Sequence, residues 1–128
     1  KNGRTPLLIA AAKGHEDFIE LLIRFLPSVN EQDNYGNSAL YYAAARGHIG
    51  VIELLLDFGA AVDLQNRQGL TALMIAASEG SLAAIQTLLE GGADRHITDF
   101  TGRNALEWGR RNNRRNVIRM LEKAKFGN

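Results

Sequence analysis

The apolar residues of this chain fall into short runs with helical spacing, separated by glycines and polar turns. An alanine-rich run over residues 38–45 predicts one short helix, with Ser38 as its N-cap and Gly47 just beyond its end. A second helix is predicted from about Ile49 to Phe58, because apolar residues recur along one of its faces. That face consists of Val51, Ile52, Leu54, Leu55 and Leu56. Neither helix is long enough to be stable alone in water, so the pair must pack against other elements.

This two-helix pattern occurs four times, with a period of 33 residues. The equivalent glycines are Gly3, Gly36, Gly69 and Gly102; the leucines Leu7, Leu40, Leu73 and Leu106 and the isoleucines Ile19, Ile52, Ile85 and Ile118 keep the same register. Thr5, Thr71 and Asn104 occupy the N-cap position of Ser38. Before the helices, Asp33-Asn34-Tyr35-Gly36 predicts a tight turn, in which the acidic side chain bonds its own backbone and the glycine adopts a positive φ. A fixed period of this length is the signature of a solenoid, so we predict one domain, 1–128, with repeats at about 1–32, 33–65, 66–98 and 99–128.

The repeated segments resemble the ankyrin repeat. The residues that carry the resemblance are "GRTPLLIAAAKGH", "GNSALYYAAARGH" and "GLTALMIAASEG", with "LLLDFGAAVD" and "LLEGGADRH" after the second helices. The resemblance covers essentially the whole chain. It implies an all-α solenoid of stacked helix-turn-helix units with β-hairpin-like turns, and it implies binding of another protein or peptide.

The sequence departs from the family's pattern at several places. The histidine that the family has after the leucine is replaced by Leu8, Tyr41, Met74 and Glu107, which puts its hydrogen bond to the turn in doubt. Pro27 is expected to stop the second helix of the first repeat. The fourth repeat, with the polar segment "RRNNRRN", is typical of a C-terminal cap. The first repeat lacks such polarity, and Ile9, Phe18 and Phe25 indicate a partner surface on its upstream side, so we expect the chain to be truncated at its N-terminus.

Composition narrows the classes of function. The 128 residues carry a net charge of only +1, with 45% hydrophobic residues, as in a folded soluble protein. Residues 103–128 are basic, with eight Lys or Arg against two acids, but no RNA-binding motif accompanies them, so we interpret this segment as a solvated end face and do not expect nucleic-acid binding. The chain has no cysteine, no visible signal peptide and no apolar run that could span a bilayer. We expect a cytoplasmic location, with the periplasm or secretion as alternatives.

No catalytic or metal-binding pattern is evident. His15 and His48 hold equivalent places after a glycine, as in the Gly-His turn of the family, and His96 stands alone between repeats. No serine lies in a nucleophile-elbow motif, and Gly91-Gly92 is a helix end without the Lys-Ser/Thr of a phosphate loop. Trp108 is expected to pack the capping repeat. We therefore predict no catalysis, no cofactor, no metal and no small-molecule substrate.

The resemblance places partner binding on the concave side, formed by the turn tips and the exposed face of each first helix. Carried over repeat by repeat, the candidate binding residues are Arg4, Lys13, Asn34, Tyr35, Asn37, Arg46, Arg67, Gln68, Leu70, Glu79, Phe100, Arg103 and Arg111. Most charges in this set are basic, and Tyr35, Leu70 and Phe100 stand at successive tips. This composition predicts an acidic peptide or protein segment as the ligand of a monomeric scaffold.

Other functions remain open at this point. The chain can be the ankyrin targeting portion of a larger enzyme or bacterial effector whose chemistry lies outside Lys1–Asn128. A designed repeat protein is disfavoured because the four copies differ freely and because "FLPSVN" breaks the pattern. Nucleic-acid binding through the basic C-terminal segment would show itself by a steep salt dependence.

Overall fold

The computed structural model describes residues 2–126 and, among these, the side chains as far as Lys123; Lys1, Gly127 and Asn128 lie outside the described residues. The helices are α1 (Pro6–Lys13), α2 (Glu16–Leu22), the 3-10 helix η1 (Ile23–Phe25), α3 (Ala39–Arg46), α4 (Ile49–Asp57), α5 (Ala72–Glu79), α6 (Leu82–Glu90), α7 (Ala105–Arg111) and α8 (Arg115–Phe126). The described residues contain no strand, which confirms the all-α class. Within them, no helix combines the length and the apolar character that crossing a membrane requires.

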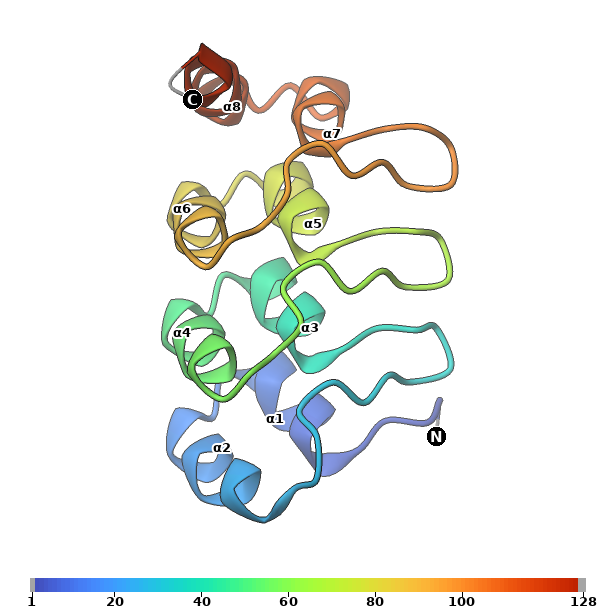
Figure 1. The fold of residues 1–128 in the computed structure, drawn as a ribbon, viewed down its shortest axis with the longest axis vertical. Coiled ribbons are helices and arrows are strands. Elements are labelled where there is room, and N and C mark those ends of the chain that lie inside the picture. Colours follow the sequence, from blue (N-terminus) through green and yellow to red (C-terminus); the bar gives the residue numbers. More distant parts are fainter. Residues whose placement is uncertain (1, 127–128) are drawn as a thin grey trace.

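The helices form two parallel rows, and the hairpin-like loops project from one of them (Figure 1). We call α1, α3, α5 and α7 the inner row, because it lies between the loops and the outer row of α2, α4, α6 and α8. Along each row, every helix packs on the equivalent helix of the next repeat, and the two helices of each repeat pack on each other. This arrangement confirms the predicted solenoid.

The helices of the inner row begin at the caps that the repeat pattern predicted. The N-cap side chains of Thr5, Ser38, Thr71 and Asn104 each accept a hydrogen bond from the backbone N–H three residues on. Gly47 ends α3 in the left-handed conformation, with φ of 69°. In the fourth repeat Asn113 takes the same place with φ of 56°, a conformation that asparagine tolerates better than most residues.

An Asp or Asn side chain bonds the backbone within each hairpin-like loop. An oxygen of Asp33 accepts hydrogen bonds from the backbone N–H groups of Tyr35 and Asn37, at 2.9 and 3.0 Å. Asn66 and Asp99 make the equivalent pairs of bonds in the next two loops. The predicted turn chemistry is therefore confirmed, and it sets the shape of each tip from within the repeat.

Two helix ends lie elsewhere than the sequence pattern suggested. The first helix of the second repeat continues one residue beyond the predicted Ala45, to Arg46, and its second helix ends at Asp57 rather than Phe58. In the first repeat, α2 ends at Leu22 and tightens into η1 before Pro27. A proline has no backbone N–H and clashes with the carbonyl of the preceding turn, so the helix narrows before reaching it.

The core runs along the solenoid between the two rows. Its most deeply buried side chains recur at equivalent positions, such as Ile19, Ile52 and Ile85, or Leu55, Leu88 and Leu121, all at most 2% exposed. Buried alanines of the inner row, such as Ala39 and Ala43, let neighbouring helices approach closely. Each repeat thus completes its apolar packing against the next one.

Truncating a core leucine should destabilise the chain far more than truncating an exposed one. Leu55→Ala removes a side chain that is 0% exposed, so we expect a loss of about 2–5 kcal/mol in the free energy of unfolding. The matched control is Leu21→Ala, because Leu21 is 64% exposed, and its cost should stay under about 0.5 kcal/mol. Urea unfolding followed by circular dichroism measures both values. Equal costs for the two variants would contradict the described core.

Candidate protein-interaction surface

We define the inner face as the surface formed by the loop tips and by the solvent-side residues of the inner row. The structure places the thirteen candidate residues along this face from the first repeat to the fourth. Most are exposed; Asn37, Leu70 and Arg103 are half-buried. The structure brings them together in three places: the row of tips, a groove between α1 and α3, and a cluster around Trp108.

The loop tips form a continuous ladder. The backbone N–H of Arg67 donates to the carbonyl of Tyr35 at 3.1 Å, and the N–H of Phe100 donates to the carbonyl of Gln68 at 3.0 Å. Asn34 makes the equivalent bond to Asn2 at 2.8 Å. These bonds set the spacing between successive tips, so the exposed rings of Tyr35 and Phe100, 53% and 70% accessible, are held on ordered backbone.

A groove of about 140 Å³ lies between α1 and α3. Its lining combines an apolar floor with a basic rim, and it consists of Arg4, Leu8, Ile9, Ala12, Lys13, Tyr42 and Arg46. Ile9 is 43% exposed, which is unusual for an isoleucine on a packed helix. Of the ion pairs among the described residues, none involves Lys13 or Arg46. Two cations without a carboxylate partner therefore border an accessible apolar surface.

Arg4, in contrast, is tied to the protein. Its guanidinium carbon lies 5.3 Å from the centroid of the Tyr42 ring, and its Nε lies 3.9 Å from a carboxylate oxygen of Asp33. The Tyr42 hydroxyl donates to that same oxygen, and the Asn37 amide donates to the Tyr42 oxygen at 3.3 Å. Asn37 also accepts a bond of 2.8 Å from Asn66, so its side chain joins neighbouring loops and has less freedom to bind a partner than the prediction assumed.

A similar cluster closes the other end of the inner face. The indole N–H of Trp108 donates to Asp99 at 2.9 Å, while the guanidinium carbons of Arg103 and Arg111 lie 5.6 and 5.8 Å from its ring centroid. Contacts of this kind between a cation and an aromatic ring stabilise both groups. Arg103, Glu107, Arg110 and Arg111 line an open hollow of about 410 Å³ beside it. Trp108 packs the capping repeat, as the sequence suggested.

The carboxyl of Asp99 is held in its charged form. Burial by itself raises its pKa, but hydrogen bonds from the Thr101 hydroxyl, from the backbone N–H groups of Arg103 and Thr101, and from the Trp108 indole lower the pKa from 3.8 to about 2. These four donors all point at a carboxylate that is 5% exposed. Asp99 is therefore a structural anion of the last loop.

The middle of the inner face is less basic than its ends. Leu70 is half-buried and packs against the core, so it offers less contact area than the prediction assumed. Glu79 at the end of α5 is exposed. Burial, the Tyr42 hydroxyl and the charge of Glu79 together raise the pKa of the neighbouring Tyr41.

The thirteen candidates leave out four residues of the groove, Leu8, Ile9, Ala12 and Tyr42. Of these, Ile9 and Tyr42 are its most informative members. The signal that could have found them is the repeat register, because Ile9, Tyr42, Ile75 and Trp108 occupy one equivalent position. Where this residue is aromatic, as Tyr42 and Trp108 are, it donates a hydrogen bond to the carboxylate of its own loop, Asp33 or Asp99. Where it is Ile75, the loop residue Asn66 bonds Asn37 instead. Glu16, Asp17 and Phe18, which border a hollow at the start of α2, lie outside the predicted surface as well.

The histidines make no evident catalytic arrangement. The Nε2 atom of His48 lies 3.1 Å from the carbonyl oxygen of Ala12 in the preceding repeat, so this histidine ties two repeats together. Residues 2–126 hold no group of three or more His, Asp or Glu side chains placed to bind a metal ion.

The Asp99 carboxyl should make stability depend on pH. Its pKa is lower in the folded chain than in the unfolded one, so its contribution is complete above pH 3.8 and is lost as the pH falls through about 2. Asp99→Asn removes this contribution. The free energy of unfolding of the variant should therefore lie below that of the wild type at pH 6, and the gap should narrow as the pH approaches 2.

Urea titrations at pH 6, 4 and 2.5 measure this gap, with Asp57→Asn on the exposed side of α4 as the control that changes a carboxyl without these donors. A gap between wild type and Asp99→Asn that stays the same at all three values would contradict the proposed role of the carboxylate.

Comparison with known proteins agrees with this geometry. The family model described as ankyrin repeats, built on three copies, matches residues 1–66 and 50–127, and the two overlapping matches together cover nearly all of the chain. No curated protein matches the sequence. The 33-residue period and the paired helices agree with this match. The chain belongs to the ankyrin-repeat family.

Proposed function

We propose that this chain is a protein-interaction module that binds an acidic segment of a partner protein on its inner face. Ankyrin repeats serve as generic protein-interaction modules and are typically non-catalytic. The proposal adds the surface and the chemistry of the ligand. The single observation that carries it is the groove between α1 and α3, where an exposed apolar floor meets the unpaired cations Lys13 and Arg46.

The charges of the chain support this choice of face. The inner face carries Arg4, Lys13, Arg46, Arg67, Arg103 and Arg111 against a single exposed acid of the candidate set, Glu79. In the first three repeats the outer row has the opposite character, with exposed acids at Glu16, Asp17, Glu20, Glu53, Asp57 and Glu90. An acidic segment is therefore attracted to one side and repelled by the other, which raises the rate of association and orients it.

The groove suggests how such a segment binds. An apolar side chain of the ligand would cover Ile9 and the edge of Tyr42, which removes apolar surface from water. Carboxylates on either side of it would pair with Lys13 and Arg46. Because these cations have no ion-pair partner among the described residues, pairing breaks no ion pair seen there, and binding costs desolvation and the ordering of two long side chains.

Removal of the inner-face contacts should abolish binding without unfolding the chain. The triple variant Tyr35→Ala, Arg46→Ala and Arg67→Ala changes three exposed side chains, so its urea midpoint should equal that of the wild type. A partner captured from native lysate by the wild type should bind the triple variant at least about tenfold more weakly, because Arg and Tyr are frequent hot-spot residues. Isothermal titration with the purified partner measures this change.

The matched control changes the outer row instead. Glu53→Ala, Asp57→Ala and Glu90→Ala remove three exposed side chains of opposite charge, and they should leave the affinity nearly unchanged. The acidic character of the ligand is tested by the double variant Lys13→Glu and Arg46→Glu, which should weaken binding more than Lys13→Gln with Arg46→Gln. If the outer-row variant loses the partner and the inner-face variants keep it, the proposed surface is wrong; if both double variants bind equally, the ligand is not acidic.

A further inference from the structure

The N-terminal face of the solenoid, which we define by Pro6, His15 and Phe18, exposes two apolar residues, Pro6 and Phe18, whose equivalents in later repeats are buried. Phe18 on α2 is 50% exposed. The equivalent residues are Val51, Ala84 and Val117, which are 0%, 0% and 1% exposed because the preceding repeat packs on them. The largest apolar side chain at this position is therefore the one that this structure leaves in solvent.

The inner row shows the same difference. Pro6 on α1 is exposed, whereas its equivalents Ala39, Ala72 and Ala105 are at most 3% exposed. Both helices of the first repeat thus present an apolar face, and the exposed positions are those that stacking buries elsewhere in the chain.

A polar contact also joins successive repeats at equivalent positions. His48 reaches back to the carbonyl oxygen of Ala12 at 3.1 Å, and in the fourth repeat the Nε of Arg114 donates to the carbonyl of Ser78 at 2.9 Å. Ala12 and Ser78 are equivalent positions, as are His48 and Arg114. In the second and fourth repeats, the residue that precedes the outer helix therefore bonds a carbonyl of the repeat before it.

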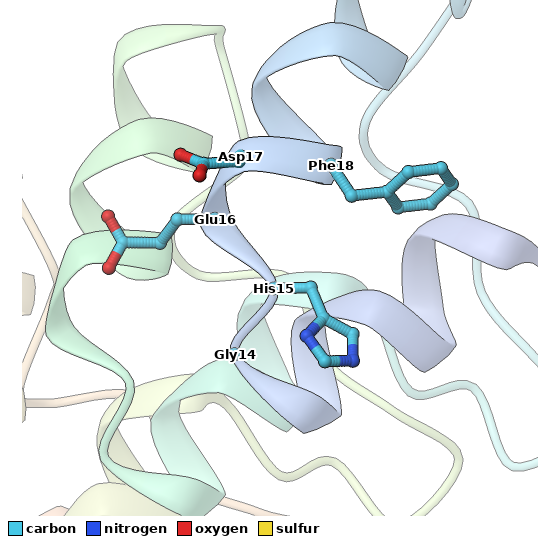
Figure 2. A pocket seen from close by; sticks show the side chains of 5 residues that line it. All are labelled: Gly14, His15, Glu16, Asp17 and Phe18. Carbon is cyan, nitrogen blue, oxygen red and sulfur yellow. The ribbon is translucent and has the colours of Figure 1, made fainter.

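His15 holds this position in the first repeat. It is exposed, and its side chain makes no hydrogen bond to another described residue. It borders a hollow of about 580 Å³ lined by Gly14, His15, Glu16, Asp17 and Phe18. Figure 2 shows the rings of His15 and Phe18 directed to one side of this segment and the two carboxylates to the other. The Glu16 carboxylate occupies the space where a Cβ would stand at Gly50, at the start of α4, so it belongs to contacts with the second repeat.

We propose that the N-terminal face seats a further ankyrin repeat, stacked one 33-residue period before the first. Its outer helix would cover Phe18, its inner helix would cover Pro6, and a carbonyl at the position of Ala12 would bond His15. This proposal is independent of the acidic ligand, because it concerns the end of the solenoid and not the groove of the inner face.

A second copy of this chain, stacked head to tail, fits the face poorly. The fourth repeat, at the opposite end of the solenoid, carries exposed polar and charged residues on α8: Arg115, Asn116 and Arg119. Burying these cations against Phe18 and Pro6 would move their charges from water into an apolar contact, which is unfavourable. A repeat with an apolar C-terminal side, such as the second or third repeat of this chain, provides the complementary surface.

The test adds such a repeat and asks whether Phe18 becomes part of a core. Residues 34–66 of this chain, joined in front of Lys1, continue the 33-residue register. The urea midpoint of this extended chain should exceed that of the original chain, with one cooperative transition. Phe18→Asp should abolish the increase and leave the original chain unchanged. Glu20→Gln, on the same helix and exposed like its equivalent Glu53, should change neither chain.

Two further outcomes would overturn the proposal. The first is an added repeat that unfolds in a separate transition, or an increase in midpoint that survives Phe18→Asp. The second is a dimer of the original chain, seen by sedimentation equilibrium and dissociated by Phe18→Asp, because a second copy would then occupy the face.

The histidines provide a control that does not depend on apolar area. His48→Ala should lower the urea midpoint of both chains, since its partner Ala12 is present in both. His15→Ala should lower the midpoint of the extended chain only. An equal effect of His15→Ala in the two chains would show that His15 acts within its own repeat, which contradicts the stacked arrangement.

Discussion

The packing of each helix pair on the next is the interaction on which this structure depends. The helices of the first three repeats have only seven to nine residues, too few to be stable in water by themselves. Their apolar sides meet across the boundary between repeats, where Ala39, Val51 and Leu55 are fully buried. The constant 33-residue register then brings equivalent residues into rows, so exposed side chains of the same kind form a stripe along the solenoid.

The rows of equivalent residues determine where charged side chains lie on the inner face. At both ends a loop carboxylate, an aromatic ring and an arginine from the preceding or the same repeat form one cluster: Asp33 with Tyr42 and Arg4, and Asp99 with Trp108 and Arg103. In the middle, Asn66 has no such ring to bond and joins Asn37 instead. The clusters hold some arginines in fixed positions, while Lys13 and Arg46 remain available beside the apolar groove. The face therefore combines ordered and adaptable cations, which suits recognition of an extended acidic segment.

Much of the fold was predictable because its causes are local. Capping by Ser38, the turn at Asp33 and the helix stop at Gly47 each involve groups within five residues, so the sequence pattern contains the complete interaction. The candidate surface was predictable only as a set of positions. The role of Asn37 depends on Asn66, which is 29 residues away, and the exposure of Ile9 depends on what covers α1. The residues next to Asn37 and Ile9 in the sequence do not indicate these contacts.

The sequence by itself determined the number of repeats, their register, the caps and the turns, because all of these follow from the identities of nearby residues and from one period. Only the tertiary structure decided which members of an equivalent row are buried. Phe18 and Val51 stand at the same place in their repeats, yet one is half exposed and the other fully covered. The physical reason is that the preceding repeat supplies the burial. It also supplies the carbonyl of Ala12 that His48 contacts, whereas His15 has no such contact with a described residue. A solenoid specifies its units locally, and it acquires its binding faces from the order in which they are stacked.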